Sequence, residues 1–327
     1  MSYLAYQVKE TAEGFKGSIK ELPIPTLEDG NVLIKVNYSS LNYKDALAAT
    51  GVKGVVKEYP FTPGIDSAGE VIDSRSNNFV RGDHVVVTGY KMGMSVNGGF
   101  GGIIHVPERW IVKIPKNLSQ LNVMEIGTAG LTAAASVKKL LDSNVSNNLP
   151  VLVSGATGGV GSVAVNILNK LNYKVHALTG KPTHEKVLVA MGAHEIIDRN
   201  EFLDSGVRPL DKAVYGGGVD TVGGDILSKM LSMTSNNGAV SCCGNVAGAN
   251  FKSSVFPFIL RGISLHGIDS AESSIELKKH LWEMLSSDWS VSLSDQTRII
   301  ELKDIEPEIS KILDGQQIGR VVIKHGE

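Results

Sequence analysis

The spacing of apolar residues changes character about one third of the way along the chain. Before residue 121, short stretches alternate between apolar and polar residues, as in 31–38, where Val32, Ile34, Val36 and Tyr38 share one face. Gly, Pro and Asn turns separate these stretches, and several short strands at such spacing predict a partly closed barrel. Further short strands are predicted at 69–72, 82–87, 103–106 and 111–114.

Residues 121–142 carry a helical pattern, and from residue 151 short apolar runs alternate with helical patterns. Such alternation predicts one doubly wound parallel sheet with helices between its strands. The expected strands are 151–154, 174–178, 195–198, 219–222, 239–243 and 263–268, and the expected helices are 159–171, 183–191 and 225–233.

The last 59 residues or so exceed what a six-stranded sheet requires, so we expect the tail to return to the first domain. It carries helical patterns at 272–288 and 305–314 and a short strand at 320–323. The sequence thus predicts an α/β protein with two domains. The first comprises 1–122 and 269–327, and the second comprises 123–268.

A glycine-rich turn follows the first strand of the second domain. Val151–Ser154 is β-branched and apolar, the turn has the pattern Ala156-x-Gly158-x-x-Gly161, and an amphipathic helix follows. Strand, turn and helix in this order are typical of a dinucleotide site, where the backbone approaches a pyrophosphate at the helix N-terminus. A tight strand–helix turn without a ligand is the alternative. The candidate cofactor contacts are Thr157, Gly158, Gly159, Val160 and Gly161.

The second strand of this domain indicates which dinucleotide binds. About 20 residues after the glycines, an NAD site places an acid on the ribose 2′-OH. This chain has Thr179, Gly180 and Lys181 there, and Arg199 follows the next short strand. A missing acid and a present cation favour the 2′-phosphate of NADP(H) over NAD(H). Lys181 and Arg199 as solvated surface charges are the alternative.

Composition excludes several classes of function. The chain has 327 residues, 42% hydrophobic and 20% charged, with a formal net charge of −2. Such a balance lacks the basic excess of a nucleic-acid surface, and no apolar run reaches the roughly 18 residues of a membrane span. Residues 1–6 lack the pattern of a signal peptide. The two cysteines, Cys242 and Cys243, are adjacent, which fits two reduced thiols and a cytoplasmic location.

Several stretches together resemble the medium-chain dehydrogenase/reductase superfamily, within it the zinc-free branch of quinone oxidoreductases and acryloyl-CoA reductases. The resemblance covers nearly the whole chain. It implies a GroES-like β-barrel catalytic domain, a Rossmann NADP-binding domain and a homodimer joined through the Rossmann sheets. The superfamily stretches are 41–45, 63–70, 82–85, 98–102, 127–133 and the nucleotide turn, and the branch stretches are 40–47, 257–261, 267–270 and 319–320.

The resemblance also implies that the chain holds no metal. Alcohol dehydrogenases of the superfamily have His-Glu where this chain has Ile65-Asp66, and their cysteine ligand falls at Asn42 or Tyr43. A zinc site needs three or four Cys, His or carboxylate ligands, whereas both thiols here lie on one Rossmann strand and the eight histidines show no ligand spacing. Reduction of an activated C=C bond or of a quinone needs no Lewis acid.

Candidate catalytic residues follow from the same resemblance. Tyr43 lies on an expected loop and is a candidate proton donor, or it orients nicotinamide and substrate; packing on the cofactor is the alternative, with water as donor. Asn42 could hold the substrate carbonyl or cap a turn. Matching positions in related chains add Thr132, Gly244, Ser270 and Gly319 as cofactor contacts.

Other local features have plainer interpretations. Asp66 is a turn former or a substrate contact, Lys44 and Asp45 form a local ion pair or a solvated turn, and 98–102 is a flexible loop. Cys242 and Cys243 are small core residues rather than nucleophiles. Around 256–260, the apolar residues are core or dimer contacts rather than a substrate slot.

The sequence therefore predicts a metal-free, NADPH-dependent reductase of an activated C=C bond, with acryloyl-CoA as the favoured substrate and propionyl-CoA as product. An NADPH:quinone oxidoreductase acting on small quinones is the first alternative. A protein that binds NADPH without turnover is the second.

Overall fold

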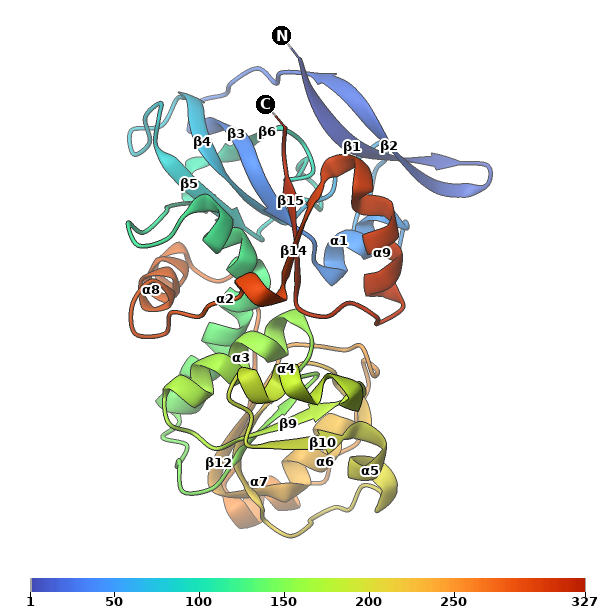
Figure 1. The fold of residues 1–327 in the computed structure, drawn as a ribbon, viewed down its shortest axis with the longest axis vertical. Coiled ribbons are helices and arrows are strands. Elements are labelled where there is room, and N and C mark those ends of the chain that lie inside the picture. The colour runs from blue at the N-terminus through green and yellow to red at the C-terminus, as the bar shows by residue number, and fades with distance from the viewer. Residues whose placement is uncertain (1, 327) are drawn as a thin grey trace. The chain divides into compact units, whose positions relative to one another are not determined.

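The strands predicted before residue 121 join one seven-stranded sheet together with two strands from the end of the chain. The computed structural model describes residues 2–326 (Figure 1). The sheet runs in the order β14-β15-β3-β4-β5-β7, and β6 pairs with β3. Val32, Ile34 and Val36 face one core, as their alternation predicts. The strands are β3 (Asn31–Ser40), β4 (Asp66–Ser74), β5 (His84–Thr88), β6 (Ile103–Pro107), β7 (Ile111–Lys113), β14 (Thr297–Glu301) and β15 (Arg320–Lys324).

Four strands and helices of this unit were not predicted: β14, given above, and the three that follow. β1 (Ser2–Thr11) and β2 (Gly14–Pro23) form an antiparallel hairpin with many exposed positions, so little apolar alternation marks them. α1 (Tyr43–Ala49) occupies the place where a loop was expected. The Asp45 carboxylate accepts the backbone N–H of Asn42 and caps the helix from inside its first turn. The expectation of a loop at Tyr43 was therefore wrong.

The second unit contains the predicted doubly wound sheet, with six parallel strands in the order β10-β9-β8-β11-β12-β13. The sheet begins at its centre with β8 and grows first to one side and then to the other. The expected strand at 219–222 lies earlier, at Tyr215–Asp220, because three consecutive glycines hide its start from an apolar pattern. The other strands are β8 (Val151–Ser154), β9 (Val175–Thr179), β10 (Glu195–Asp198), β12 (Thr234–Cys242) and β13 (Ser264–Gly267).

Helices connect these strands and complete the tail. The connecting helices are α3 (Gly159–Lys170), α4 (Glu185–Ala190), α5 (Arg199–Asp204), α6 (Gly224–Met233) and α7 (Phe256–Arg261), and the tail carries α8 (Ile275–Leu285) and α9 (Ile305–Leu313). Short 3-10 turns lie at Glu108–Trp110, Pro182–His184, Ser294–Gln296 and Leu302–Asp304. Within residues 2–326, no helix has the length and apolar character needed to cross a membrane.

The internal contacts of the chain divide it into two units. The first comprises residues up to 128, 271–288 and from 292 onward, and the second comprises 129–270 and 289–291. α2 (Gln120–Asp142) includes the first division and is interrupted by Gly127, whose φ of 54° and ψ of −161° are not helical. The expected helix at 121–142 therefore exists, but it has a break before its second turn ends.

The glycine-rich stretch 98–102 is packed rather than flexible, so that expectation was wrong. Phe100 is fully buried, and the backbone N–H groups of Gly98 and Gly99 donate to the carbonyls of Thr62 and Gly64, each at 2.8 Å. A Cβ atom on Gly99 would lie 2.2 Å from the carbonyl oxygen of Asp66. Glycine is needed here because two backbone segments approach closely.

Candidate active site

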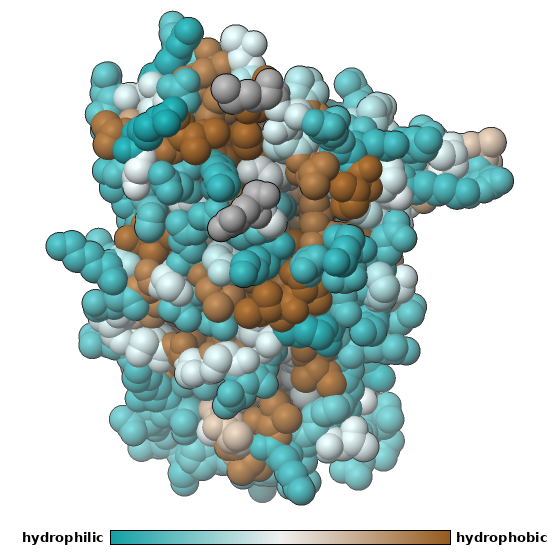
Figure 2. All heavy atoms as spheres, turned by 45° about the horizontal axis from the view of Figure 1, so that its top comes forward, coloured by the Kyte–Doolittle hydropathy of each residue, from teal (hydrophilic) through white to brown (hydrophobic). Residues whose placement is uncertain are grey.

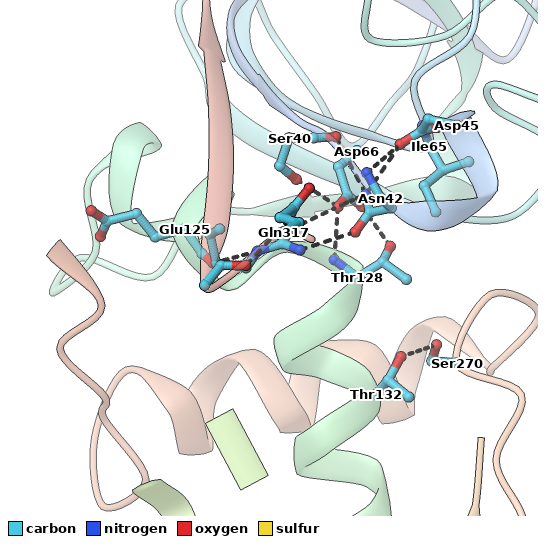
Figure 3. A network of polar contacts seen from close by, with 12 residues as sticks. Ser40, Asn42, Asp45, Ile65, Asp66, Glu125, Thr128, Thr132, Ser270 and Gln317 are labelled. Carbon is cyan, nitrogen blue, oxygen red and sulfur yellow. Dashed lines mark hydrogen bonds and ion pairs between the residues drawn. The ribbon is translucent and has the colours of Figure 1, made fainter. Parts of the chain in front are cut away.

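Asp66 is the centre of a buried polar network in the first unit (Figure 3). It begins β4, and its Oδ2 atom accepts hydrogen bonds from Ser40 Oγ at 2.7 Å, Asn42 Nδ2 at 2.8 Å and Thr128 N at 2.9 Å. The hydroxyl of Thr128 donates to Oδ1. These bonds tie together β3, the start of α1, β4 and α2. Of the two roles that the sequence suggests for Asp66, turn former or substrate contact, they support the structural one.

Arg320 supplies the positive charge of the network. It is only 2% exposed, its Nη2 lies 3.9 Å from Asp66 Oδ2, and its Nε donates to the carbonyl of Glu125 at 3.0 Å. Its Nη1 donates to Asn42 Oδ1 at 3.3 Å. The Asn42 amide thus donates to Asp66 and accepts from Arg320, so its orientation is set by buried partners. Its catalytic role stays a prediction.

Asp45 is a second buried carboxylate beside Asp66, and the expectation of a solvated turn or a local pair with Lys44 was wrong. Its Oδ1 accepts the N–H of Ile65 at 2.8 Å and its Oδ2 accepts the N–H of Asn42 at 2.9 Å. Burial, followed by the negative charge of Asp66, raises the pKa of Asp45 from 3.8 to about 7, although these hydrogen bonds oppose the shift.

Gly127 allows α2 to approach this network. A Cβ atom at this position would lie 2.6 Å from Asp66 Oδ2 and 2.8 Å from Ser40 Oγ. Its dihedral angles also lie in a region that side-chain-bearing residues avoid. Asp45, Arg320 and Gly127 were not among the predicted site residues, because their partners are distant in the sequence. Asp66 was considered only as a turn former or a substrate contact.

Tyr43 is the exposed residue next to this network. It is the first residue of α1, directly follows Asn42, and its side chain is 36% exposed. The buried contacts of Asn42 and Asp45 fix the backbone on both sides of it. A partly exposed tyrosine at a helix start whose backbone is held by buried contacts is suited to meeting a small molecule.

The glycine turn of the second unit has the geometry expected of a dinucleotide site. A Cβ atom on Gly161 would lie 2.3 Å from the carbonyl of Gly155, so only glycine lets α3 pack this close to the turn. Gly158 caps α3 with no side chain over the helix N-terminus. The Thr157 hydroxyl lies 3.3 Å from that of Thr179, which links this turn to the end of β9.

The structure also brings together the residues predicted to choose the dinucleotide. Thr179 Oγ1 accepts the N–H of Lys181 at 3.0 Å. Arg199, at the start of α5, lies over Gly180, since a Cβ atom on that glycine would be 3.1 Å from Arg199 Cζ. Burial lowers the pKa of Lys181. The ends of β9 and β10 thus carry Thr179, Lys181 and Arg199, with the Arg199 guanidinium over Gly180.

Three further candidates lie on the same unit, and a fourth belongs to the first unit. The hydroxyls of Thr132 and Ser270 are 2.6 Å apart (Figure 3), and Gly244 follows the carboxyl end of β12. Gly319 belongs to the first unit, as do Asn42 and Tyr43, and it adopts a φ of 62° just before β15.

The cofactor fits the second unit on grounds of its own geometry. The candidate contacts lie at or just after the carboxyl ends of parallel strands, namely Thr157–Gly161, Thr179–Lys181, Arg199, Gly244 and Ser270. The strand order reverses between β8 and β11. Ligands of such sheets bind outside this edge, where the order reverses. The bare N-terminus of α3 suits a pyrophosphate, and Lys181 with Arg199 suits a further phosphate.

The described part of the chain shows no cluster of metal-binding side chains. Residues 2–326 contain no group of three or more His, Cys, Asp or Glu side chains placed to hold a metal ion. The absence of zinc from the protein stays a prediction.

Burial raises the pKa of Cys242 to about 11 and of Cys243 to about 12, with the charge of Asp220 as the next cause, so both thiols stay protonated at neutral pH.

Comparison with known proteins identifies the family. Residues 28–116 match the family model of the alcohol dehydrogenase GroES-like domain, and 159–287 match that of the zinc-binding dehydrogenases. A quinone oxidoreductase named YhfP from Bacillus subtilis is 39% identical over 98% of both chains. The acrylyl-CoA reductase AcuI from Ruegeria pomeroyi is 38% identical over 94% of both chains.

Solved structures agree with this relationship. The YhdH oxidoreductase from Salmonella enterica, in complex with NADP, is 36% identical and superposes with a TM-score of 0.94 over 98% of this chain and 99% of that one. YhfP, with NAD bound, superposes with a TM-score of 0.95 over 99% of both chains. The chain belongs to the medium-chain dehydrogenase/reductase superfamily, in the oxidoreductase branch that includes YhfP, YhdH and AcuI. The predicted family and its GroES-like and Rossmann folds are confirmed.

Proposed function

We propose that this protein is an NADPH-dependent reductase of an activated carbon–carbon double bond, with acryloyl-CoA as substrate and propionyl-CoA as product. The observation that carries the proposal is the 38% identity to an acrylyl-CoA reductase over 94% of both chains. The site geometry supports the choice of cofactor, because Lys181 and Arg199 lie where an NAD-specific site has an acid.

Residues of the second unit hold the dinucleotide in this proposal. The N-terminus of α3 from Gly158 to Gly161 receives the pyrophosphate, and Thr179, Lys181 and Arg199 receive the 2′-phosphate. Bound NADPH supplies a hydride to the β-carbon of the substrate. No metal takes part, which stays a prediction of the sequence.

Tyr43 has the proton-donating or orienting role in the first unit. Reduction leaves negative charge on the substrate oxygen, and a proton has to reach the α-carbon. Tyr43 presents a phenol on a rigid helix start, and Asn42 lies beside it with an amide held by Asp66 and Arg320.

Replacing Tyr43 with phenylalanine separates these roles from simple packing. We expect Tyr43→Phe to lower kcat by roughly 10²-fold, the lower range for a lost general acid, while NADPH affinity stays constant. Stopped-flow turnover and fluorescence titration with NADPH measure the two quantities. An unchanged kcat would leave Tyr43 as a packing residue and assign the proton to water.

An NADPH:quinone oxidoreductase is the second candidate function. It is favoured by the 39% identity over 98% of both chains to YhfP, which is named a quinone oxidoreductase. The solved YhfP structure contains NAD, so the choice of dinucleotide also needs a test in this protein.

One experiment distinguishes these activities. Dinucleotide oxidation is followed at a fixed enzyme concentration with acryloyl-CoA, crotonyl-CoA and a benzoquinone offered separately, with NADPH and then with NADH. We expect rapid turnover with NADPH and acryloyl-CoA. Turnover on the quinone alone would favour the second function, and NADPH binding without turnover on any acceptor would favour a binding protein.

A homodimer and a cytoplasmic location belong to the same proposal. β13 is an edge strand of the six-stranded sheet, and the neighbouring α7 exposes apolar side chains, including Ile259, which is 68% exposed. A second copy would cover both the edge and these side chains.

The two thiols, present without a disulfide, support a reducing compartment. On the face drawn in Figure 2, hydrophilic residues surround smaller apolar patches.

A further inference from the structure

Asp220 is a buried carboxylate at the centre of the dinucleotide edge of the second unit. It is the last residue of β11, the strand beside β8, and it is fully buried. The strand order reverses between these two strands. Asp220 is absent from the set of predicted cofactor contacts, and the proposed reaction gives it no task.

Its two carboxylate oxygens connect the turns that follow β8 and β11. Oδ1 accepts the hydroxyl of Ser154 at 2.7 Å, and Oδ2 accepts the N–H of Gly223 at 2.9 Å. The Ser154 hydroxyl in turn accepts the N–H of Thr221 at 2.9 Å, and the Thr221 hydroxyl donates to the Ser154 carbonyl at 2.8 Å. Ser154 directly precedes the turn from Gly155 to Gly161.

Asp220 and Thr221 also hold the turn that follows β12. The carbonyl of Asp220 accepts the N–H of Cys243 at 3.0 Å. Gly244 packs against Thr221 so closely that a Cβ atom on it would lie 1.8 Å from the Thr221 carbonyl. Asp220 and Thr221 thus hold three turns at one edge of the sheet, and two of them carry predicted cofactor contacts.

A carboxylate suits this position because it offers two acceptors and no donor. Asparagine has the same shape, but its NH₂ group would face either the Ser154 hydroxyl or the Gly223 N–H, both of which donate. Burial raises the pKa of Asp220, and the donors from Ser154, Gly223, Val222 and Cys242 oppose that shift. The hydrogen bonds therefore stabilise the ionised form against its desolvation.

We propose that Asp220 is a positioning residue for dinucleotide binding, which acts through Ser154 on the Gly155–Gly161 turn and through Thr221 on Gly244. The proposal rests on the proposed function, because it concerns the affinity of that site for NADPH. Asp220 itself need not touch the cofactor.

The test compares NADPH affinity with thermal stability in matched variants. Asp220→Asn removes one acceptor and adds a misplaced donor. Thr234→Val is the control, since Thr234 is also fully buried and its hydroxyl donates to the Met230 carbonyl at 2.8 Å, at the opposite end of β12. We expect Asp220→Asn to raise the NADPH dissociation constant at least tenfold. Thr234→Val lowers the Tm but changes that constant less than twofold.

A milder variant keeps the test decisive if Asp220→Asn does not fold. Ser154→Ala removes the hydroxyl between Asp220 and Thr221, and we expect it to raise the NADPH dissociation constant about threefold. Unchanged affinity in Ser154→Ala and Asp220→Asn, or an equal loss in Thr234→Val, would overturn the positioning role alone. A wild-type protein that binds neither NADPH nor NADH would overturn the proposed function and this inference together.

Discussion

Two buried carboxylates and one buried guanidinium lie beside the start of α1. Asp45, Asp66 and Arg320 cannot all be ionised without a surplus negative charge in a region of low dielectric. Arg320 contacts Asp66 at 3.9 Å and donates to Asn42 rather than to Asp45. Burial and the negative charge of Asp66 raise the pKa of Asp45 to about 7, so Asp45 takes up a proton near neutral pH.

This proton makes the stability of the first unit depend on pH. The folded protein binds it with a pKa of about 7, whereas the ordinary value is 3.8, so the stabilisation is complete below pH 3.8 and is lost as pH rises through 7. We expect the free energy of unfolding of the wild type to fall more steeply between pH 3.8 and about 7 than that of Asp45→Asn. Urea unfolding across this range measures both slopes, with the exposed Asp29→Asn as control. Parallel curves would show that Asp45 stays ionised throughout.

Lys181 decides between the two dinucleotides in the proposed function. Lys181→Ala should weaken NADPH binding by ~1–3 kcal/mol, the range for a hydrogen bond to a charged group, and leave NADH binding nearly unchanged. Calorimetric titration with each dinucleotide measures this difference. Lys186→Ala, on the exposed surface of α4, is the control. Equal losses for NADPH and NADH would exclude a contact with the 2′-phosphate.

Candidate site residues could be proposed from the sequence where the pattern that marks them lies within one segment. The Thr179–Lys181 stretch and the missing acid are visible in one segment, and the structure places Arg199 against that segment. Asp45, Asp66 and Asp220 could not be recognised, because their burial depends on donors 20 or more residues away, such as Ile65 for Asp45 and Ser154 for Asp220. A charged residue beside a turn looks solvated until its distant partners are known.

At the level of elements, the apolar pattern located four of the six strands of the parallel sheet near their observed positions, and it placed the starts of β11 and β12 too late. It missed the β1–β2 hairpin, whose exposed positions give little alternation, and α1, which depends on a cap. It also missed the short elements β14, α5 and α7. It also gave no sign of the break in α2, because the break depends on how Gly127 meets Asp66 in space. Local periodicity predicts buried faces well and contacts between distant elements poorly.

The break at Gly127 leads to a prediction for helix α2. Gly127→Ala forces a side chain into a region of dihedral angles that costs about 1–3 kcal/mol, and its Cβ also meets Asp66 Oδ2. We expect the free energy of unfolding to fall by more than about 2 kcal/mol. Gly30→Ala is the matched control, since Gly30 has a φ of 74° but open space around it. Urea unfolding compares the two, and equal losses would mean that the contact with Asp66 does not matter.

At the level of the whole molecule, association between copies is the proposal that the apolar surface of α7 supports. We expect the wild type to sediment as a dimer and Ile259→Glu to sediment as a monomer, because the charge would be buried at the contact. Val80→Glu is the control, at an exposed apolar position of the first unit. Analytical ultracentrifugation at several concentrations measures the state, and a monomeric wild type would contradict the proposal.

The packed stretch 98–102 matters to anyone who wishes to engineer this protein. Protein engineers look for glycine-rich stretches when they choose where to insert a tag, a fluorescent domain or new chain termini. Here such an insertion would separate backbone segments that touch through Gly99 and Asp66, and would expose the fully buried Phe100. The turn between β1 and β2, where a Cβ atom on Gly14 would meet nothing within 4 Å, is the safer place.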